Sequence, residues 1–198
     1  MPHIDYYFAT ISPYTYLSGT RPGEVAKKHG ATITYKPCDI MALFARTGGT
    51  PPKDRHPNRQ AYRLQDMERR AKVLDKSLNI KPMFWPTNSA PSAYAIIAAQ
   101  NAGHDVSGLV ASIGSAIWSE ERDISQDDVV RDCLEKNGLD PALADADMLT
   151  SAETFARNLE DAVGAGVFGA PFFVVDSGQV FWGEDRIDDL DAHLAGKI

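Results

Sequence analysis

The strand-forming segments at the two ends of the chain constrain its fold more than any other feature. Residues 3–8 (HIDYYF) and 32–36 (TITYK) are rich in aromatic and β-branched residues and predict two short strands. Residues 14–29 predict a helix between them, broken or kinked near Pro22 and closed by Gly30. The N-terminal segment therefore predicts a β-α-β unit, whose crossover should be right-handed.

The C-terminal segment predicts a second unit with a different order. Residues 172–175 form an apolar run suited to a buried strand, and a turn signal at 176–178 separates it from another strand at 180–182. A final helix is expected over residues 186–194, where apolar residues recur at spacings of three and four. The chain thus ends in a β-β-α unit, and we expect an α/β fold.

Between these two units the sequence predicts helices. Apolar residues recur at helical spacing from Leu64 to Leu78 and from Val106 to Ile117, and residues 90–101 form a helix of small residues. Further helix starts are indicated at Ser125, where SQDD resembles a capping box, at Asp140-Pro141 and at Ser151.

Composition and charge exclude several classes of function. The net charge is −7, from 20 basic and 27 acidic residues, which argues against nucleic-acid binding because phosphate contacts need clustered cations. The chain has neither a signal-peptide pattern nor a run approaching the ~20 apolar residues of a membrane span, so we expect a cytoplasmic protein without a membrane partner. The five histidines are scattered and there is no C-x-x-C pair, so we expect no metal site. A disulfide between Cys38 and Cys133 is possible in principle, but a reducing cytosol favours free thiols.

Positive charge is concentrated in one segment. Residues 53–76 contain eight Lys or Arg against four Asp or Glu. A basic helix beside the loop at Pro51-Pro52 would attract a small ligand that bears a carboxylate. The alternative is a solvated helix face with ion pairs between successive turns.

Ser12 and Pro13 stand where the first strand leads into the first helix. Serine is a preferred helix N-cap, and proline is favoured at the first helical position. The same place is where open α/β sheets bind ligands, and the helix N-terminus favours an anion. Taken alone, the segment favours a structural cap, and a functional role requires support from the rest of the chain.

Residues 167–186 (VFGAPFFVVDSGQVFWGEDR) supply that support. An Ala-Pro before the third strand, between a β-α-β front and a β-β-α back, resembles the disulfide-oxidoreductase branch of the thioredoxin superfamily. The resemblance implies a thioredoxin-like fold with a large all-helical insertion, the architecture of DsbA-like proteins and kappa glutathione transferases. Residues 1–40 plus 165–198 would form the thioredoxin-like domain, and residues 41–164 the insertion. Pro171 would be cis and would face Ser12.

Redox members of that superfamily carry C-x-x-C where this chain has Ser12-Pro13-Tyr14-Thr15. Disulfide exchange needs a thiolate and a resolving thiol, so it is excluded at this site. The chain is more similar to kappa-class glutathione transferases, and most of all to bacterial 2-hydroxychromene-2-carboxylate isomerases. The segments that carry this similarity are the SPYTYL start at 12–17, YKP at 35–37, LFARTG at 43–48, FWPTN at 84–88 and the tail at 166–186.

The family resemblance implies that glutathione supplies the missing thiol. Ser12 would donate a hydrogen bond to its sulfur and, with the helix N-terminus, lower the thiol pKa from about 8.5. Ala170 beside Pro171 would pair with its main chain. The γ-glutamyl end would be held by Trp182, Gly183, Glu184 and Asp185, with Asp185 suited to the ammonium group.

The same resemblance suggests residues for the substrate carboxylate and carbonyl, namely Lys36, Gly48, Gly49 and Asn88. Structural roles are alternatives for Lys36, which could end a strand, and for Asn88, which could cap the helix at Ala90. Trp182 could likewise be core, and Asp185 could cap the last helix. The chain departs from its relatives at Gly49, where they tend to have Asn, and Trp85 and Glu184 are individual features that could reshape specificity.

The implied reaction is a cis-trans isomerisation. The thiolate adds reversibly to a conjugated benzylidenepyruvate, rotation occurs about the resulting single bond, and elimination restores the double bond. We therefore expect a glutathione-dependent isomerase interconverting 2-hydroxychromene-2-carboxylate and trans-o-hydroxybenzylidenepyruvate-type compounds in aromatic degradation, a homodimer like its relatives. The alternatives are a kappa-like glutathione transferase that conjugates electrophiles and a non-catalytic thiol- or peptide-binding module.

Overall fold

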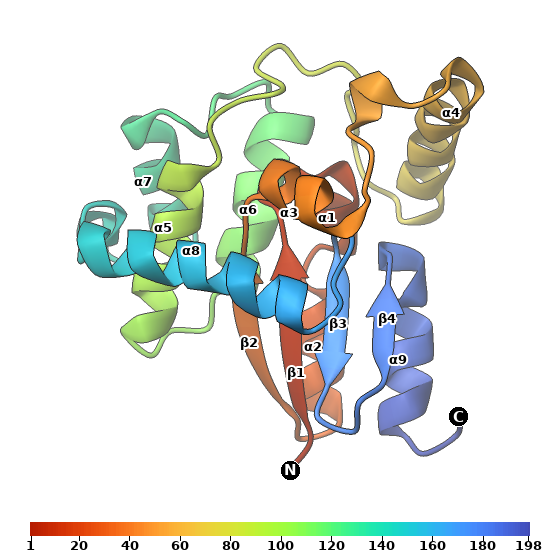
Figure 1. Ribbon diagram of the computed structural model, residues 1–198. Coiled ribbons are helices and arrows are strands. Elements are labelled where there is room, and N and C mark those ends of the chain that lie inside the picture. The colour runs from red at the N-terminus through yellow and green to blue at the C-terminus, as the bar shows by residue number, and fades with distance from the viewer.

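A four-stranded mixed sheet forms the centre of the computed structural model, which describes residues 1–198, and helices cover both of its faces (Figure 1). The strands are β1 (His3–Phe8), β2 (Thr32–Pro37), β3 (Phe172–Val175) and β4 (Val180–Trp182), in the order β2-β1-β3-β4. β1 is parallel to β2 and antiparallel to β3, which is antiparallel to β4. This is the thioredoxin-like arrangement that the family resemblance implies.

The first helical segment is divided in two near the place predicted. α1 (Pro13–Ser18) ends at Gly19, and α2 (Arg21–Lys28) begins after Thr20. Pro22 lies in the first turn of α2, where a missing N–H costs no helical hydrogen bond. The predicted interruption near Pro22 is therefore confirmed as a break, which lies just before this proline at Gly19 and Thr20.

The remaining helices lie between β2 and β3 or after β4. They are α3 (Ile40–Thr47), η1 (Pro52–Asp54), α4 (Pro57–Val73), α5 (Ala90–Asn101), α6 (Ser107–Trp118), α7 (Asp127–Lys136), η2 (Pro141–Ala144), α8 (Met148–Gly164), η3 (Glu184–Arg186) and α9 (Ile187–Leu194). None of them combines the length and apolar character that a membrane crossing requires.

Three predicted helix boundaries differ from the structure. The 64–78 pattern continues beyond the end of α4, although Leu74 and Leu78 still pack against the core. The predicted capping box at Ser125 is wrong, because Asp123 takes the Ser125 N–H at 3.0 Å and α7 begins after Gln126 without a side-chain cap. α8 begins at Met148, three residues before the predicted Ser151.

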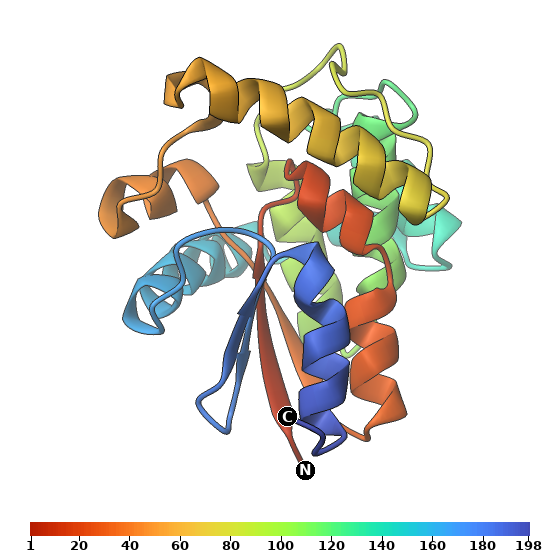
Figure 2. The ribbon, with the colours of Figure 1, turned by 90° about the vertical axis from the view of Figure 1, so that its right-hand side faces the viewer.

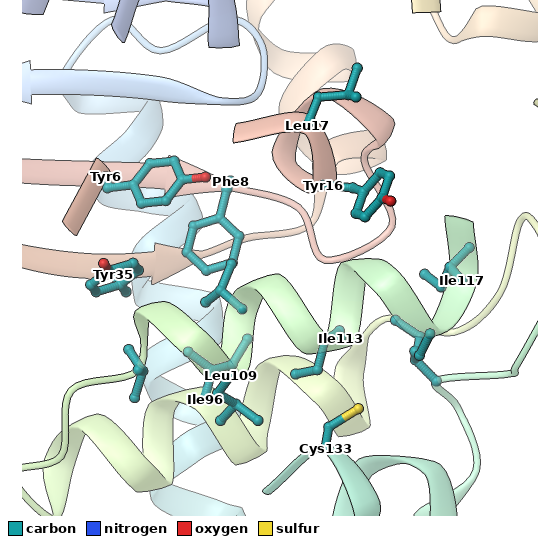
Figure 3. Close-up of a cluster of buried hydrophobic side chains, with 14 of the residues drawn as sticks. Tyr6, Phe8, Tyr16, Leu17, Tyr35, Ile96, Leu109, Ile113, Ile117 and Cys133 are labelled. Atoms are coloured by element: carbon teal, nitrogen blue, oxygen red, sulfur yellow. The ribbon is translucent and has the colours of Figure 1, made fainter. Parts of the chain in front are cut away.

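The core lies mainly on one face of the sheet. The side chains of Ile4, Tyr6 and Phe8 point to the same face of β1. They belong to a cluster of 28 buried residues, to which α5, α6 and α7 also contribute side chains (Figure 3). The rings of Tyr6 and Phe173 stack across β1 and β3 at 4.8 Å. Each large apolar side chain buried here contributes about 1.5–3 kcal/mol, so this cluster anchors the sheet beneath the helices.

Candidate functional site

Sheet register brings the two ends of the chain together near Ser12. Tyr7 on β1 is paired with Phe172 on β3, so the next residues outward are Phe8 and Pro171. The loop that leads from Phe8 to Ser12 therefore lies at the same end of the sheet as the Ala170-Pro171 segment. α1 and α4 lie over this end (Figures 1 and 2).

Ser12 is the N-cap of α1. Its Oγ accepts a hydrogen bond from the Thr15 N–H at 3.3 Å, and its carbonyl accepts one from the Tyr16 N–H at 3.1 Å. A hydroxyl that accepts the capping bond still has its proton to donate, and this side chain is only partly buried. The cap and the sulfur-binding role predicted for Ser12 are therefore compatible.

The Ala170–Pro171 peptide bond is cis, as the resemblance implies. The Pro171 carbonyl accepts a hydrogen bond from the Gly183 N–H at 3.0 Å, whereas Ala170 makes no main-chain hydrogen bond. Its N–H and C=O are the groups that an extended ligand would use to pair in β-strand fashion. The structure thus leaves a short free edge beside Pro171.

A cavity of about 200 Å³ opens between the α3–η1 loop and the segment before β3. Phe168 and Trp182 form one side of it, with ring centroids 4.8 Å apart, and Phe44, Gly48 and Gly49 contribute to the other. Trp182 is 53% exposed, so the core alternative for this residue is wrong. The cavity brings together three predicted site residues: Gly48, Gly49 and Trp182.

Gly49 is in close contact with an aromatic ring. A Cβ atom at this position would lie 2.1 Å from Cδ1 of Phe44, a distance that no side chain tolerates. Phe44 therefore occupies the space in which the Asn of related sequences would begin. The glycine at position 49 thus leaves room for the Phe44 ring, which forms part of the cavity wall.

Asp185 has an exposed carboxylate beside the free edge. Arg186 donates to it at 2.9 Å and also binds Asp189 at 2.8 Å, which fixes the local turn. No side-chain hydrogen bond from Asp185 caps the last helix. Its carboxylate is thus accessible, as the predicted contact with an ammonium group requires.

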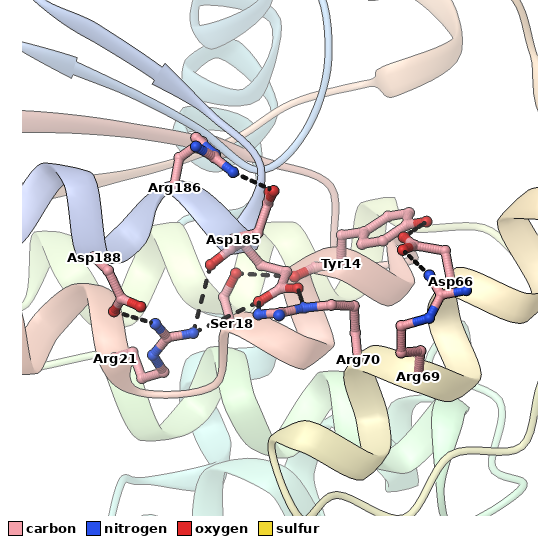
Figure 4. Close-up of polar contacts among 10 residues, drawn as sticks. Tyr14, Ser18, Arg21, Asp66, Arg69, Arg70, Asp185, Arg186 and Asp188 are labelled. Carbon is pink, nitrogen blue, oxygen red and sulfur yellow. Dashed lines mark hydrogen bonds and ion pairs between the residues drawn. The ribbon is translucent and has the colours of Figure 1, made fainter.

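Glu184 points the other way, into the protein. Only 1% of it is exposed, and its carboxylate accepts two hydrogen bonds from the Arg70 guanidinium, with Arg21 at 3.6 Å (Figure 4). These bonds hold the pKa of Arg70 above its usual value. The carboxylate has no face left for a ligand, so the predicted contact of this side chain with glutathione is not supported.

Two of the predicted substrate residues also have other partners. Lys36 Nζ lies 3.2 Å from Asp5 and from Asp161 of α8, and 3.3 Å from the Tyr7 hydroxyl. Burial lowers the pKa of Lys36, but Tyr7 and Asp5 raise it by more. Asn88 accepts the N–H of Ala90, the first residue of α5, at 3.1 Å, although the N-cap position itself is Ser89, whose side chain makes no capping bond. Lys36 thus forms ion pairs on the sheet face under α8, and Asn88 binds the main chain at the start of α5.

Sequence reasoning missed the cationic wall of the site. Arg55 donates to the Thr50 carbonyl at 2.8 Å, lies 5.9 Å from the Phe44 ring and lines the cavity together with Arg59. The excess of positive charge in residues 53–76 was the available signal. It could not show which of the eight cations line this cavity.

Neither cysteine reaches the site. Cys38 and Cys133 are free and buried, and burial raises their thiol pKa values to about 12 and about 11. A thiolate at Ser12 must therefore come from a ligand.

Comparisons with known proteins agree with this geometry. Residues 3–195 match the DSBA-like thioredoxin domain family. A 2-hydroxychromene-2-carboxylate isomerase of Sphingobium xenophagum is 31% identical over 196 residues, which cover 96% of this chain and 97% of that protein. A crystallised 2-hydroxychromene-2-carboxylate isomerase has a TM-score of 0.75 at 21% identity, covering 98% of this chain and 95% of that chain. The cytosolic disulfide reductase DsbM of Pseudomonas aeruginosa with GSH has a TM-score of 0.73 at 18% identity, covering 98% of each chain.

Fold and site together define a DsbA-like protein of the thioredoxin superfamily that lacks the redox cysteine pair. Within that superfamily, the chain belongs to the 2-hydroxychromene-2-carboxylate isomerase family.

Proposed function

We propose that the protein is a glutathione-dependent isomerase that interconverts 2-hydroxychromene-2-carboxylate and trans-o-hydroxybenzylidenepyruvate-type compounds. The observation that carries the proposal is the Ser12 hydroxyl at the N-terminus of α1, at the same end of the sheet as the unpaired main chain of Ala170. The site has the groups that a thiol ligand needs, and the chain's own thiols are buried in its core clusters. The relationship to named isomerases supports the reaction class.

The residues present fit glutathione. Ser12 would donate a hydrogen bond to the sulfur, and the dipole of α1 would add to the stabilisation of the thiolate. The N–H and C=O of Ala170 would pair with the ligand main chain next to Pro171. Asp185, held by Arg186, would accept the ammonium group, and the exposed Trp182 ring would cover the peptide.

Glutathione would supply a nucleophile that adds reversibly to a conjugated double bond. The chain would contribute the positioning. Ser12 keeps the sulfur ionised near neutral pH, and Phe44, Phe168 and Trp182 form apolar walls against which an aromatic ring can lie. Arg55 and Arg59 place positive charge beside those walls, which suits a substrate that carries a carboxylate.

The direct test is to mix the purified protein with 2-hydroxychromene-2-carboxylate, with and without glutathione, and follow the ultraviolet spectrum. We expect rapid conversion to the trans-benzylidenepyruvate only when glutathione is present. The absence of any glutathione-dependent acceleration would overturn the isomerase proposal.

A glutathione transferase is the second candidate, because the same site would serve irreversible conjugation. Mass spectrometry of the reaction mixture separates the two, since an isomerase returns free glutathione and a transferase accumulates the adduct. Calorimetry with glutathione tests the third candidate, a non-catalytic module. Failure to bind glutathione would rule out both the isomerase and the transferase.

A further inference from the structure

Three arginines near the site have no acidic partner. On α4, Arg69 pairs with Asp66 and Arg70 with Glu184, whereas Arg59 and Arg63 pair with no carboxylate, and neither does Arg55 before the helix. Arg63 is partly buried, and burial together with the nearby Arg55 lowers the pKa of its guanidinium. Unpaired cations that are partly desolvated and close together favour the binding of an anion.

The position of Arg63 is fixed relative to Ser12. Its guanidinium carbon lies 5.6 Å from the centre of the Trp85 ring, within cation–π range. The Trp85 Nε1–H in turn donates to the carbonyl of Ile11, the residue before Ser12, at 2.9 Å. Trp85 also packs on the buried Trp118, with ring centroids 5.7 Å apart. A short chain of contacts therefore holds the cation next to the start of α1.

The acidic side chain three residues after Arg63 on α4 already has partners. Asp66 lies one helical turn beyond Arg63 and accepts a hydrogen bond from the Tyr14 hydroxyl at 2.9 Å and one from Arg69 at 3.4 Å. The N–H groups of the Arg63 guanidinium therefore remain free to donate hydrogen bonds to a ligand. A planar guanidinium held near an indole ring can bind a carboxylate through two parallel hydrogen bonds.

We propose that Arg63, held by Trp85, binds the carboxylate of the substrate at Ser12 and selects anionic over neutral substrates. This inference rests on the proposed function only in taking Ser12 as the place of reaction. It assigns the direct contact with the carboxylate to Arg63, whereas Arg55 and Arg59, which line the cavity next to Phe44 and Trp182, add a general attraction for an anion.

The test compares trans-cinnamate, an arylpropenoate, with its neutral carboxamide by calorimetry, using Arg63→Gln, Arg63→Lys and the wild-type protein. The wild type should bind cinnamate about tenfold or more tightly than cinnamamide, since a charged hydrogen-bonded pair is lost in the amide. Arg63→Gln should abolish this preference and leave cinnamamide binding unchanged, and Arg63→Lys should restore part of it. Lys72→Gln, on the same helix but about 13 Å further along its axis, is the charge-matched control and should keep the full preference.

Kinetics give a second readout. With 2-hydroxychromene-2-carboxylate, Arg63→Gln should raise KM about tenfold or more and change kcat little, because the lost contact is made in ground state and transition state alike. An unchanged preference for cinnamate in Arg63→Gln, or no preference in the wild type, would overturn the inference. A preference that depends on Arg63 in a protein without isomerase turnover would leave this inference standing and refute the proposed reaction.

Discussion

The carboxylate of Glu184 and the guanidinium of Arg70, 114 residues apart in sequence, form a two-point ion pair beneath the site. The pair fastens α4, in the helical region between β2 and β3, to the segment that follows β4. Glu184 is only 1% exposed, so the carboxylate of this pair is buried. The wall of the site that α4 provides is thus attached to the sheet domain at this point.

Replacing Arg70 by Met should lower the free energy of unfolding by about 3 kcal/mol, because it leaves a buried carboxylate with only the more distant Arg21. Urea denaturation followed by circular dichroism measures the change. Arg46→Gln, which breaks an exposed pair with Glu160, should leave the urea midpoint unchanged. Equal midpoints for wild type and Arg70→Met would show that the pair does not hold α4.

Ser12→Ala should raise the pKa of bound glutathione by about one to two units. A hydrogen bond to a charged group is worth about 1.5–3 kcal/mol, and one pKa unit corresponds to about 1.4 kcal/mol. The thiolate of the variant would therefore form at higher pH, and turnover at neutral pH would fall. Ultraviolet absorption of the thiolate across a pH titration measures the shift. Ser177→Ala, an exposed serine bonded to His193, is the control, and an unshifted titration in Ser12→Ala would reduce Ser12 to a cap.

Gly49→Asn should displace the Phe44 ring and cost about 1–3 kcal/mol of stability, because the new Cβ needs space that the ring occupies. Glutathione-dependent turnover should show a higher KM, since Phe44 forms part of the cavity wall. Gly48→Asn is the control for the clash: its backbone is left-handed, with φ +78°, so the change carries its own strain, but no atom lies within 4 Å of the added Cβ and the Phe44 ring should stay in place. If Phe44→Ala fails to restore the stability of Gly49→Asn, the clash is not the cause.

The two thiols should be unreactive in the folded protein. Cys38 and Cys133 are each 1% exposed, and burial raises their pKa values to about 12 and about 11, so almost no thiolate is present at neutral pH. A thiol reagent such as DTNB should titrate two groups only after denaturation. Iodoacetamide treatment of the folded protein, followed by its removal, should leave turnover intact. Rapid loss of activity would instead assign a function to one of these cysteines.

Local sequence patterns were sufficient to predict the strands. β1, β3 and β4 begin and end where the apolar and β-branched runs do, because strand formation here follows short stretches bounded by turn residues. The predicted start of α7 was less accurate, because the Asp123 carboxylate accepts the Ser125 N–H in place of the predicted capping bond. Such competition between two short polar side chains is not visible in a helix-start pattern.

The relative positions of the candidate residues could be predicted where they depend on the sheet and not where they depend on the helices around it. The family resemblance placed Pro171 opposite Ser12, and the register of β1 and β3 agrees with that placement. The direction of Lys36 follows from its pairing with Tyr7, which puts both on the face under α8. Arg63 could not be placed, because the position of α4 depends on long-range contacts such as Tyr14 with Asp66.

Both chain ends lie at the end of the sheet opposite α1 and α4 (Figures 1 and 2). An affinity tag, a fluorescent protein or a surface linker attached at either end would therefore project away from Ser12. The protein could be immobilised through its N-terminus or its C-terminus with the candidate site still open to solution, and the two orientations should give equal turnover if the proposed function holds.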